Sequence, residues 1–296
     1  MLNSTVSNMI DKKILTTGLE GMLGSNIVHH LQSKEIVGYN RSQLDITNPD
    51  TVNAVLSREK PDIIIHTAAY TDVDGCELDK NKAYTVNTLG TQNLVNYCID
   101  KEILFIYISS TGVYGAAKNV AYTEFDQVCP TTIHHKSKHE GEKIVQNHLE
   151  KYLILRSGWL YGGDKMHAKN FVYKRFLEAR SKDTIYSDAS QIGNPTYVAD
   201  FVQQMQLLIK HQQYGIFNCV NNAIGVSRYD YVKKIVELFD LKCDVKIAPE
   251  GMYSRVAPIS KNESALNYKL NLSGLNIMGN WEKSLEKYIL HLKDEL

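Results

Sequence analysis

The sequence lacks a net charge and a charged patch: among its 296 residues, 33 Lys and Arg side chains balance 33 Asp and Glu side chains. A neutral chain without a basic patch has little means of attracting nucleic acid or an anionic membrane surface. The sequence also lacks an apolar run of the roughly 18–20 residues that span a bilayer. We therefore expect neither nucleic acid nor a membrane as a partner.

Cysteine pairs are missing as well. The five cysteines are odd in number, are scattered along the chain and form no C-x-x-C pair: Cys76, Cys98, Cys129, Cys219 and Cys243. This pattern is typical of reduced thiols and argues against both a disulfide framework and a zinc site. Residues 1–13 are polar and lack the apolar core of a signal peptide. We expect a cytoplasmic protein.

Metal-ligand patterns are equally scarce. His135 and His139 are spaced i, i+4 on a predicted helix. A metal site needs further ligands, and the H-E-x-x-H frame is absent. We interpret the pair as solvated histidines on a helix surface and expect no metal.

Short apolar runs alternate with helix-length segments through the first two-thirds of the chain. The expected strands are residues 14–17, 35–39, 62–67, 103–109 and 152–156, and the expected helices are 21–33, 49–60, 82–101 and 134–149. This alternation predicts an α/β fold with a doubly wound, Rossmann-like parallel sheet.

Beyond residue 162 the alternation loosens, with helices expected near residues 171–180, 198–210 and 228–238 and at the C-terminus. We predict a dinucleotide-binding domain over residues 1–162 and a smaller, C-terminal substrate domain over residues 163–296. Some segments of the second part are expected to return to the first sheet.

A glycine-rich turn follows the first predicted strand. Gly18, Gly21 and Gly24 have the spacing G-x-x-G-x-x-G, and Met22 and Leu23 stand between the last two. Gly18 permits a sharp exit from the strand, Gly21 lets the backbone approach a pyrophosphate, and Gly24 permits close packing of the helix on the sheet. The helix N-terminus offers free N–H groups to phosphates. The turn therefore predicts a nicotinamide dinucleotide site.

In such folds, a residue at the end of the second strand contacts the 2′ position of the cofactor ribose. An acidic residue there favours NAD(H). This chain has Asn40 and Arg41 instead. An arginine can pair with a 2′-phosphate. NADP(H) is therefore favoured over NAD(H).

Several further segments occur in the order of a known family. They are residues 44–48 (LDITN), 68–74 (AAYTDVD), 86–87 (VN), 108–115 (ISSTGVYG), 155–162 (LRSGWLYG) and 193–196 (GNPT). On these segments, nearly the whole chain from residue 14 onward resembles the extended short-chain dehydrogenase/reductases, and within them the dTDP-4-dehydrorhamnose reductases.

The resemblance implies roles for individual residues. Ser110 would bind the substrate carbonyl, and Lys138 would bind the nicotinamide ribose and lower the pKa of a proton-donating tyrosine. In this family that tyrosine precedes the lysine by four residues, but this chain has His134 there. Positions i and i+4 share one helix face. We therefore place His134 with Ser110 and Lys138 as the candidate catalytic residues.

The resemblance also implies binding residues. Those expected at the cofactor, besides the glycine turn, Asn40, Arg41 and Lys138, are Asp45, Ile46, Ala68, Ala69, Tyr70 and Asn87. Those expected at the substrate are Thr71, Val73, Ser110, Trp159 and Asn170.

The missing tyrosine leaves three interpretations of His134 open. It is the acid itself, because histidine is the commonest general acid–base residue; or the protein binds cofactor without catalysis; or the acid lies elsewhere. The leading hypothesis is NADPH-dependent reduction of a nucleotide-linked 4-keto-6-deoxy sugar for surface-polysaccharide synthesis. A catalytically silent regulatory or scaffold protein and a related nucleotide-sugar epimerase or dehydratase are the alternatives. The sequence leaves a homodimer open.

Overall fold

The computed structural model describes residues 9–165 and 167–296, so residues 1–8 of the polar N-terminal stretch lie outside the described part. Its centre is a six-stranded sheet in the order β2-β1-β3-β4-β5-β9, and all its pairings are parallel. The strands are β1 (Ile10–Thr17), β2 (Ser33–Tyr39), β3 (Ile63–His66), β4 (Leu104–Ser110), β5 (Tyr152–Ser157) and β9 (Gly215–Cys219). The predicted doubly wound parallel sheet is confirmed.

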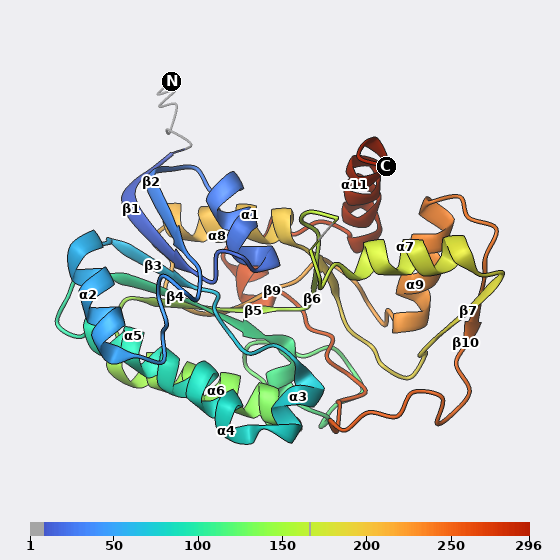
Figure 1. The fold of residues 1–296 in the computed structure, drawn as a ribbon, viewed down its shortest axis with the longest axis horizontal. Helices are drawn as coiled ribbons and strands as arrows, with labels where there is room; N and C mark the ends of the chain where they lie inside the picture. Colours follow the sequence, from blue (N-terminus) through green and yellow to red (C-terminus); the bar gives the residue numbers. More distant parts are fainter. Residues whose placement is uncertain (1–8, 166) are drawn as a thin grey trace.

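Helices cover both faces of this sheet (Figure 1). On one face lie α2 (Pro49–Glu59), α5 (Gly90–Cys98) and α6 (Ile133–His148); on the other lie α1 (Met22–His30) and α8 (Val198–Lys210). Successive strand residues point to opposite faces. Ile14 accordingly packs in the core under α1 and α8, and Leu15 packs in the core under α2 and α5. Burial on both faces explains why the strands have almost continuous apolar sequences.

The segment between β3 and β4 corrects the prediction of one helix over residues 82–101. It contains α3 (Val73–Leu78), α4 (Lys80–Tyr84), the π-helical turn η1 (Thr85–Leu89) and α5. Asp72 and Asp79 each cap a new helix, because their side chains accept hydrogen bonds from the amides of Gly75 and Lys82. The π-turn contains Asn87, and such turns are frequent at functional sites.

The second part of the chain divides its elements between two places. Helix α8 packs on the main sheet, and strand β9 is part of that sheet. A smaller unit lies beside it (Figure 1) and consists of α7 (Phe171–Ser181), α9 (Arg228–Leu238), β7 (Thr184–Ser187) and β10 (Asp244–Ile247). Strands β7 and β10 pair in parallel. The small unit has its own apolar cluster: Ala179, Ile185, Val232, Val236, Cys243 and Val245.

The two parts share one apolar core. Phe176 of α7 and Tyr231 of α9 belong to the same buried cluster as Phe201 of α8 and Tyr288 of α11 (Trp281–Asp294). The short strands β6 (Trp159–Tyr161) and β8 (Pro195–Tyr197) pair beside it, and η2 (Thr111–Tyr114) and α10 (Tyr268–Leu272) complete the elements. A continuous core fixes the smaller unit against the carboxyl ends of the main strands.

Candidate active site

The sheet order reverses between β1 and β3, and open α/β sheets bind ligands outside the carboxyl ends of the strands at such a point. Here β1 ends at Thr17 and β3 ends at His66. The threonine hydroxyl joins the two ends, because Thr17 Oγ1 accepts a hydrogen bond from Ala68 N at 3.1 Å and lies 2.9 Å from His66 Nδ1. The predicted glycine turn and the loop after β3 therefore share one crevice.

Two glycines of this turn, Gly18 and Gly24, stand where there is no room for a side chain. Gly18 has φ +73°, and a Cβ there would lie 2.8 Å from Thr67 Oγ1 and 2.9 Å from Ala68 N. A Cβ at Gly24 would lie 2.1 Å from Gly18 O. Gly21 precedes α1 and has no side chain to cap it, so the amides of Met22 and Leu23 at the helix start are available to an anion. This cradle without side chains fits the pyrophosphate of a dinucleotide.

The loop after β2 lies beside the same turn. Asn40 Nδ2 donates to Glu20 Oε1 at 2.9 Å, and Asn40 Oδ1 accepts from Ser42 Oγ at 2.8 Å. Arg41 is exposed. Asn40 thus fastens the loop, and Arg41 is the charged residue in it that stays accessible to a ligand.

Asp45 and Ile46 follow this loop. Asp45 Oδ1 accepts hydrogen bonds from the hydroxyl and the amide of Thr47, which lower the pKa of the carboxyl group. Ile46 is buried against Gly90, where a Cβ would lie 2.7 Å from Ile46 Cδ1. The Ile46 side chain therefore packs in the protein, and only its backbone remains for a cofactor contact.

Asn87 holds the loop that contains Ala68, Ala69, Tyr70 and Thr71. Its Oδ1 accepts from Tyr70 N at 2.7 Å, and its Nδ2 donates to Tyr70 O at 3.1 Å and to Ser137 Oγ at 2.9 Å. Asn87 is buried. Its amide is fully engaged with protein, so it positions the loop beside the crevice and has no side-chain atom left for the cofactor.

Sequence reasoning missed His66, although a polar side chain ending an apolar strand is a readable signal. Its Nε2 lies 3.1 Å from Thr91 Oγ1, and its Nδ1 faces Thr17. Burial holds the pKa of His66 well below its ordinary value, and the charge of Lys138 adds to this effect. A neutral His66 therefore connects β1, β3 and α5 behind the crevice.

Lys138 is buried on α6 against β4. Its Nζ lies 3.9 Å from the ring centroid of Tyr107, and the Tyr107 hydroxyl donates to Lys138 O at 3.2 Å. Burial lowers the pKa of Lys138 to about 7, although the Glu142 carboxylate opposes the shift. The ammonium is thus poised to respond to an incoming ligand near neutral pH.

Helix α6 is anchored by a buried ion pair one turn beyond Lys138. Arg156 Nε and Nη2 donate to the two carboxylate oxygens of Glu142 at 2.9 and 2.7 Å. Burial alone would raise the pKa of Glu142, but Arg156 and His139 hold it at about 2. The pair joins α6 to β5 and so fixes the height of Lys138 along the sheet.

His134 lies one helical turn before Lys138, as its spacing predicts. Its Nδ1 lies 3.0 Å from Tyr70 O and 4.0 Å from Cys76 Sγ. A carbonyl oxygen only accepts, so we infer that Nδ1 carries the proton and that Nε2 of the neutral ring has a lone pair. Burial, His135 and Lys138 hold the pKa of His134 well below its ordinary value. Near neutral pH His134 is therefore a poor acid.

The interpretation of His135 and His139 as solvated surface residues is wrong. His135 is buried, with Nδ1 3.0 Å from Thr132 Oγ1 and Nε2 3.5 Å from Ser110 Oγ. His139 is partly buried, and its Nδ1 lies 3.3 Å from Glu142 Oε2. The prediction failed because α6 is covered by the sheet on one side and by residues 110–115 on another.

Within residues 9–165 and 167–296, no three His, Cys, Asp or Glu side chains gather as metal ligands.

The residues expected at the substrate divide into two groups. Trp159 is half-buried beside the carboxyl end of β5; its Nε1 donates to Glu263 Oε2 at 2.9 Å, and the Arg228 guanidinium lies 3.5 Å from its ring centroid. Thr71 is exposed and accepts from Lys169. Val73 begins α3 and is half-buried. These three residues remain accessible.

Asn170 is a correction. It is fully buried and caps α7: its Oδ1 accepts from Tyr173 N, and its Nδ2 donates to Asp164 O and the Tyr288 hydroxyl. Every polar atom of its side chain therefore has a protein partner, which leaves none for a substrate. The resemblance implied a substrate contact, but the position of Asn170 at a helix start instead reflects the preference of asparagine for helix caps.

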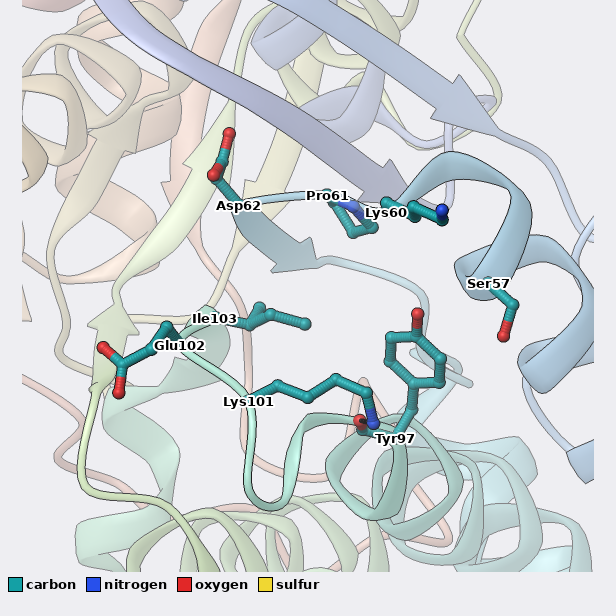
Figure 2. A pocket seen from close by; sticks show the side chains of 8 residues that line it. All are labelled: Ser57, Lys60, Pro61, Asp62, Tyr97, Lys101, Glu102 and Ile103. Atoms are coloured by element: carbon teal, nitrogen blue, oxygen red, sulfur yellow. Dashed lines mark hydrogen bonds between the residues drawn. The ribbon is translucent and has the colours of Figure 1, made fainter.

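A cavity of about 400 Å³ lies away from these residues (Figure 2). Asp62 and Ile103 in its wall precede β3 and β4, so it lies at the amino ends of the strands. Its full lining is Ser57, Lys60, Pro61, Asp62, Tyr97, Lys101, Glu102 and Ile103. The glycine turn, Ser110 and Lys138 belong to the opposite end of the sheet.

In the described part of the chain, no helix is long and apolar enough to cross a membrane.

Comparison with known proteins gives the same assignment over the whole chain. The profile of the RmlD substrate binding domain matches residues 12–293. A dTDP-4-dehydrorhamnose reductase from Aggregatibacter actinomycetemcomitans is 33% identical over 77% of this chain and 78% of its own length. The spore coat polysaccharide biosynthesis protein SpsK of Bacillus subtilis is 26% identical over 94% of this chain and 96% of its own length. The crystal structure of dTDP-4-dehydrorhamnose reductase from Bacillus anthracis in complex with NADP has a TM-score of 0.90 and 31% identity, and the match covers 95% of this chain and all of that one. The chain therefore belongs to the RmlD substrate-binding domain family of extended short-chain dehydrogenase/reductases.

Proposed function

We propose that this protein is an oxidoreductase that uses NADPH to reduce the keto group of a nucleotide-linked 4-keto-6-deoxy sugar. One observation carries the proposal: Ser110 ends β4, and Lys138 is buried against Tyr107 of that same strand. In this proposal the Ser110 hydroxyl would bind the carbonyl and the Lys138 ammonium would bind the ribose, at the end of the sheet that holds the glycine turn. The names of the relatives support the choice of a dTDP-linked sugar.

The bound nicotinamide would supply the hydride. The protein would hold its pyrophosphate at the amides of Met22 and Leu23, and Lys138 would donate to the nicotinamide ribose. Gly18 lets this turn pack closely against Thr67 and Ala68 of the neighbouring loop. Ala68, Ala69 and the Ile46 backbone would border the adenosine half.

The preference for NADP(H) over NAD(H) rests on Arg41. It is exposed at the carboxyl end of β2, next to the phosphate-binding turn. A guanidinium donates to phosphate in a bidentate manner, and a neutral asparagine before it does not repel that phosphate.

Substrate would enter from the smaller unit. Trp159 would contact the sugar with the part of its half-buried ring that Arg228 leaves uncovered, because apolar surfaces gain from leaving water. Thr71 and Val73 would face the same space from the loop after β3. The match to SpsK, which is named for spore coat polysaccharide biosynthesis, supports a role in surface-polysaccharide synthesis.

One observation favours a second candidate, a cofactor-binding protein without catalysis. His134 replaces the tyrosine acid of the family, and its proton is engaged with Tyr70 O. A protein in this state holds NADPH but has no acid at position 134.

Two measurements separate the candidates. Quenching of the fluorescence of Trp159 and Trp281 would report NADPH binding. Loss of absorbance at the nicotinamide band after addition of a dTDP-4-keto-6-deoxy sugar would report reduction. The proposed reductase gives both signals, and the silent protein gives only the first. Tight NADPH binding with no turnover on any keto sugar would therefore overturn the proposed reaction.

A further inference from the structure

We infer that His135, and not His134, delivers the proton to the substrate oxygen, and that the proton passes through the Ser110 hydroxyl. The inference rests on the proposed reductase function and names the acid that the missing tyrosine leaves unassigned. It starts from the geometry of the two adjacent histidines, which lie with their rings edge to face at a centroid distance of 5.0 Å.

The His135 ring is held at both of its nitrogens. Nδ1 lies 3.0 Å from Thr132 Oγ1, and Nε2 lies 3.5 Å from Ser110 Oγ. The ring also packs against Gly112, where a Cβ would fall 2.1 Å from His135 Cε1. A ring fixed in this way keeps Nε2 directed at Ser110. Catalytic hydrogen bonds are often long before substrate binds and shorten in the complex, so 3.5 Å is compatible with this role.

The surroundings of Ser110 set the direction of its hydroxyl proton. Ser110 Oγ accepts a hydrogen bond from Gly112 N at 3.1 Å. A hydroxyl has two acceptor lone pairs and one donor hydrogen. When His135 Nε2–H occupies the second lone pair, the hydrogen of Ser110 is left to point at the substrate carbonyl.

His134 does not offer this path. Its proton-bearing Nδ1 faces Tyr70 O, which also accepts from Asn87 Nδ2. The remaining nitrogen of the neutral ring is an acceptor and cannot donate to a ketone. His135, by contrast, has an oxygen partner at each ring nitrogen, Thr132 Oγ1 at Nδ1 and Ser110 Oγ at Nε2, so its protonated form can donate toward Ser110.

The proton balance closes with the groups on hand. Bound NADPH would supply the hydride for the new C–H bond at the keto carbon and be converted to NADP⁺, which leaves negative charge on the carbonyl oxygen. The Ser110 O–H gives its proton to that oxygen while protonated His135 gives its Nε2 proton to Ser110 Oγ. The ketone is thereby reduced to an alcohol, and neutral His135 keeps its own Nδ1 proton, which is directed at Thr132 Oγ1. Water then restores the proton to His135.

The charge on His135 is set by its burial and by two neighbours, Glu263 and His134. Burial lowers the pKa of His135, and the Glu263 carboxylate raises it. His134 faces it from the same helix and is neutral near pH 7. Glu263 is itself held by Trp159 Nε1, the residue proposed to meet the sugar. The rate should therefore fall as the pH rises through the pKa of His135.

The test compares His135→Gln with His134→Gln, and His148→Gln serves as a control because His148 is exposed near the end of the same helix. Glutamine can still donate to Ser110 but does not titrate. We expect His135→Gln to lower kcat about 100-fold, the smaller end of the range for general acids. It should also remove the step in the pH profile that belongs to His135 and leave the step of Lys138, whose pKa is about 7, while the KM for the sugar and the Kd for NADPH change less than about 3-fold.

His134→Gln and His148→Gln should keep the pH dependence. Thermal melting and NADPH binding show that each variant is folded. A folded His135→Gln that keeps the wild-type kcat and pH profile would overturn the inference, and so would loss of the pH dependence in His134→Gln.

A second readout does not need turnover. In ¹⁵N-histidine NMR spectra, Ser110→Ala should shift the Nε2 resonance and the pKa of His135 and leave those of His134 unchanged. If the wild-type protein binds NADPH but reduces no keto sugar, the proposed function has failed. The Ser110–His135 contact then stands or falls on this spectrum alone, and an unchanged His135 resonance would contradict it.

Discussion

The Nδ1 atom of His134 lies 3.0 Å from the carbonyl oxygen of Tyr70. His134 replaces the tyrosine of the family, and this contact directs its side chain toward the loop after β3. Because the Nδ1 proton is hydrogen-bonded to the Tyr70 carbonyl oxygen, it is not available to a substrate. The family fold, the glycine turn and the lysine are all present around it. In the proposed function this site holds a cofactor and a carbonyl, and its acid lies at a position other than 134.

Restoring the tyrosine should increase the rate. A positioned acid contributes roughly 10²–10⁴-fold to a proton-transfer step, so we expect His134→Tyr to raise kcat at least about 10-fold. Lys138 lies one helical turn away and would favour the tyrosinate form. Stopped-flow or steady-state NADPH oxidation measures the change, and His148→Tyr is the matched control. A folded His134→Tyr with no gain would show that the site has diverged at more positions than this one.

Removing Arg41 should change the cofactor preference. The hydrogen bonds of a guanidinium to a phosphate contribute roughly 1.5–3 kcal/mol. We therefore expect Arg41→Ala to weaken NADPH binding about tenfold or more and to leave NADH binding unchanged. Fluorescence titration with both cofactors gives the ratio. Lys34→Ala, at an exposed position near the start of β2, is the control, and equal losses for both cofactors would reject the role of Arg41.

The glycine turn and the alternating strands and helices could be predicted from the sequence because they depend on local spacing. Helices 198–210 and 228–238 were also predicted with the observed bounds. Helix α3 was missed because it is only one to two turns long and is defined by its capping aspartates. The pairs β6–β8 and β7–β10 join segments far apart in the chain, which periodicity does not report.

The same limit applies to the candidate site. Ser110, His134 and Lys138 could be named from the resemblance to the reductase family, which places them at matching positions. The burial of His135 could not, because helical periodicity assigns adjacent residues to different faces and does not show that α6 is covered on more than one side. Asn170 was misassigned because the sequence alone does not distinguish an asparagine that caps a helix from one that binds a ligand.

The buried Lys138 side chain should lower the free energy of unfolding near neutral pH. Its pKa is about 7 in the folded protein and near 10.4 in the unfolded chain. Between these values the unfolded state binds a proton that the folded state does not, so the cost is greatest at and below pH 7 and falls as the pH rises toward 10. Lys138→Met should therefore stabilise the protein by about 1–4 kcal/mol at pH 7, the range for buried charges replaced by apolar side chains.

Chemical denaturation at pH 7 and pH 9.5 measures this difference. The gain in Lys138→Met should shrink at the higher pH. Lys136→Met, at an exposed position on the same helix, should show no such dependence. A gain of the same size at both pH values would contradict the lowered pKa.

Breaking the buried ion pair should destabilise the fold. Glu142→Gln leaves the Arg156 guanidinium buried without a carboxylate, and removal of one partner from such a pair costs about 3–5 kcal/mol. Because the folded pKa of Glu142 is about 2, its contribution is present above the unfolded value near 4.3 and is lost as the pH falls toward 2. Urea denaturation at pH 7 and pH 3 should show a smaller difference between wild type and variant at pH 3.

Glu140→Gln provides the comparison, because Glu140 pairs with Lys143 on the exposed side of the helix. Such a surface pair contributes about 0–1 kcal/mol. A loss in Glu142→Gln no larger than that in Glu140→Gln would mean that the pair with Arg156 does not anchor α6.

The most direct test of the central claim follows the hydrogen itself. Purified protein is mixed with a dTDP-4-keto-6-deoxy sugar and NADPH that carries deuterium at the transferred position of the nicotinamide, and the sugar is analysed by mass spectrometry and NMR. A reductase gives an alcohol with deuterium on the former keto carbon. Recovery of the unreduced keto sugar, with NADPH bound but intact, would contradict it.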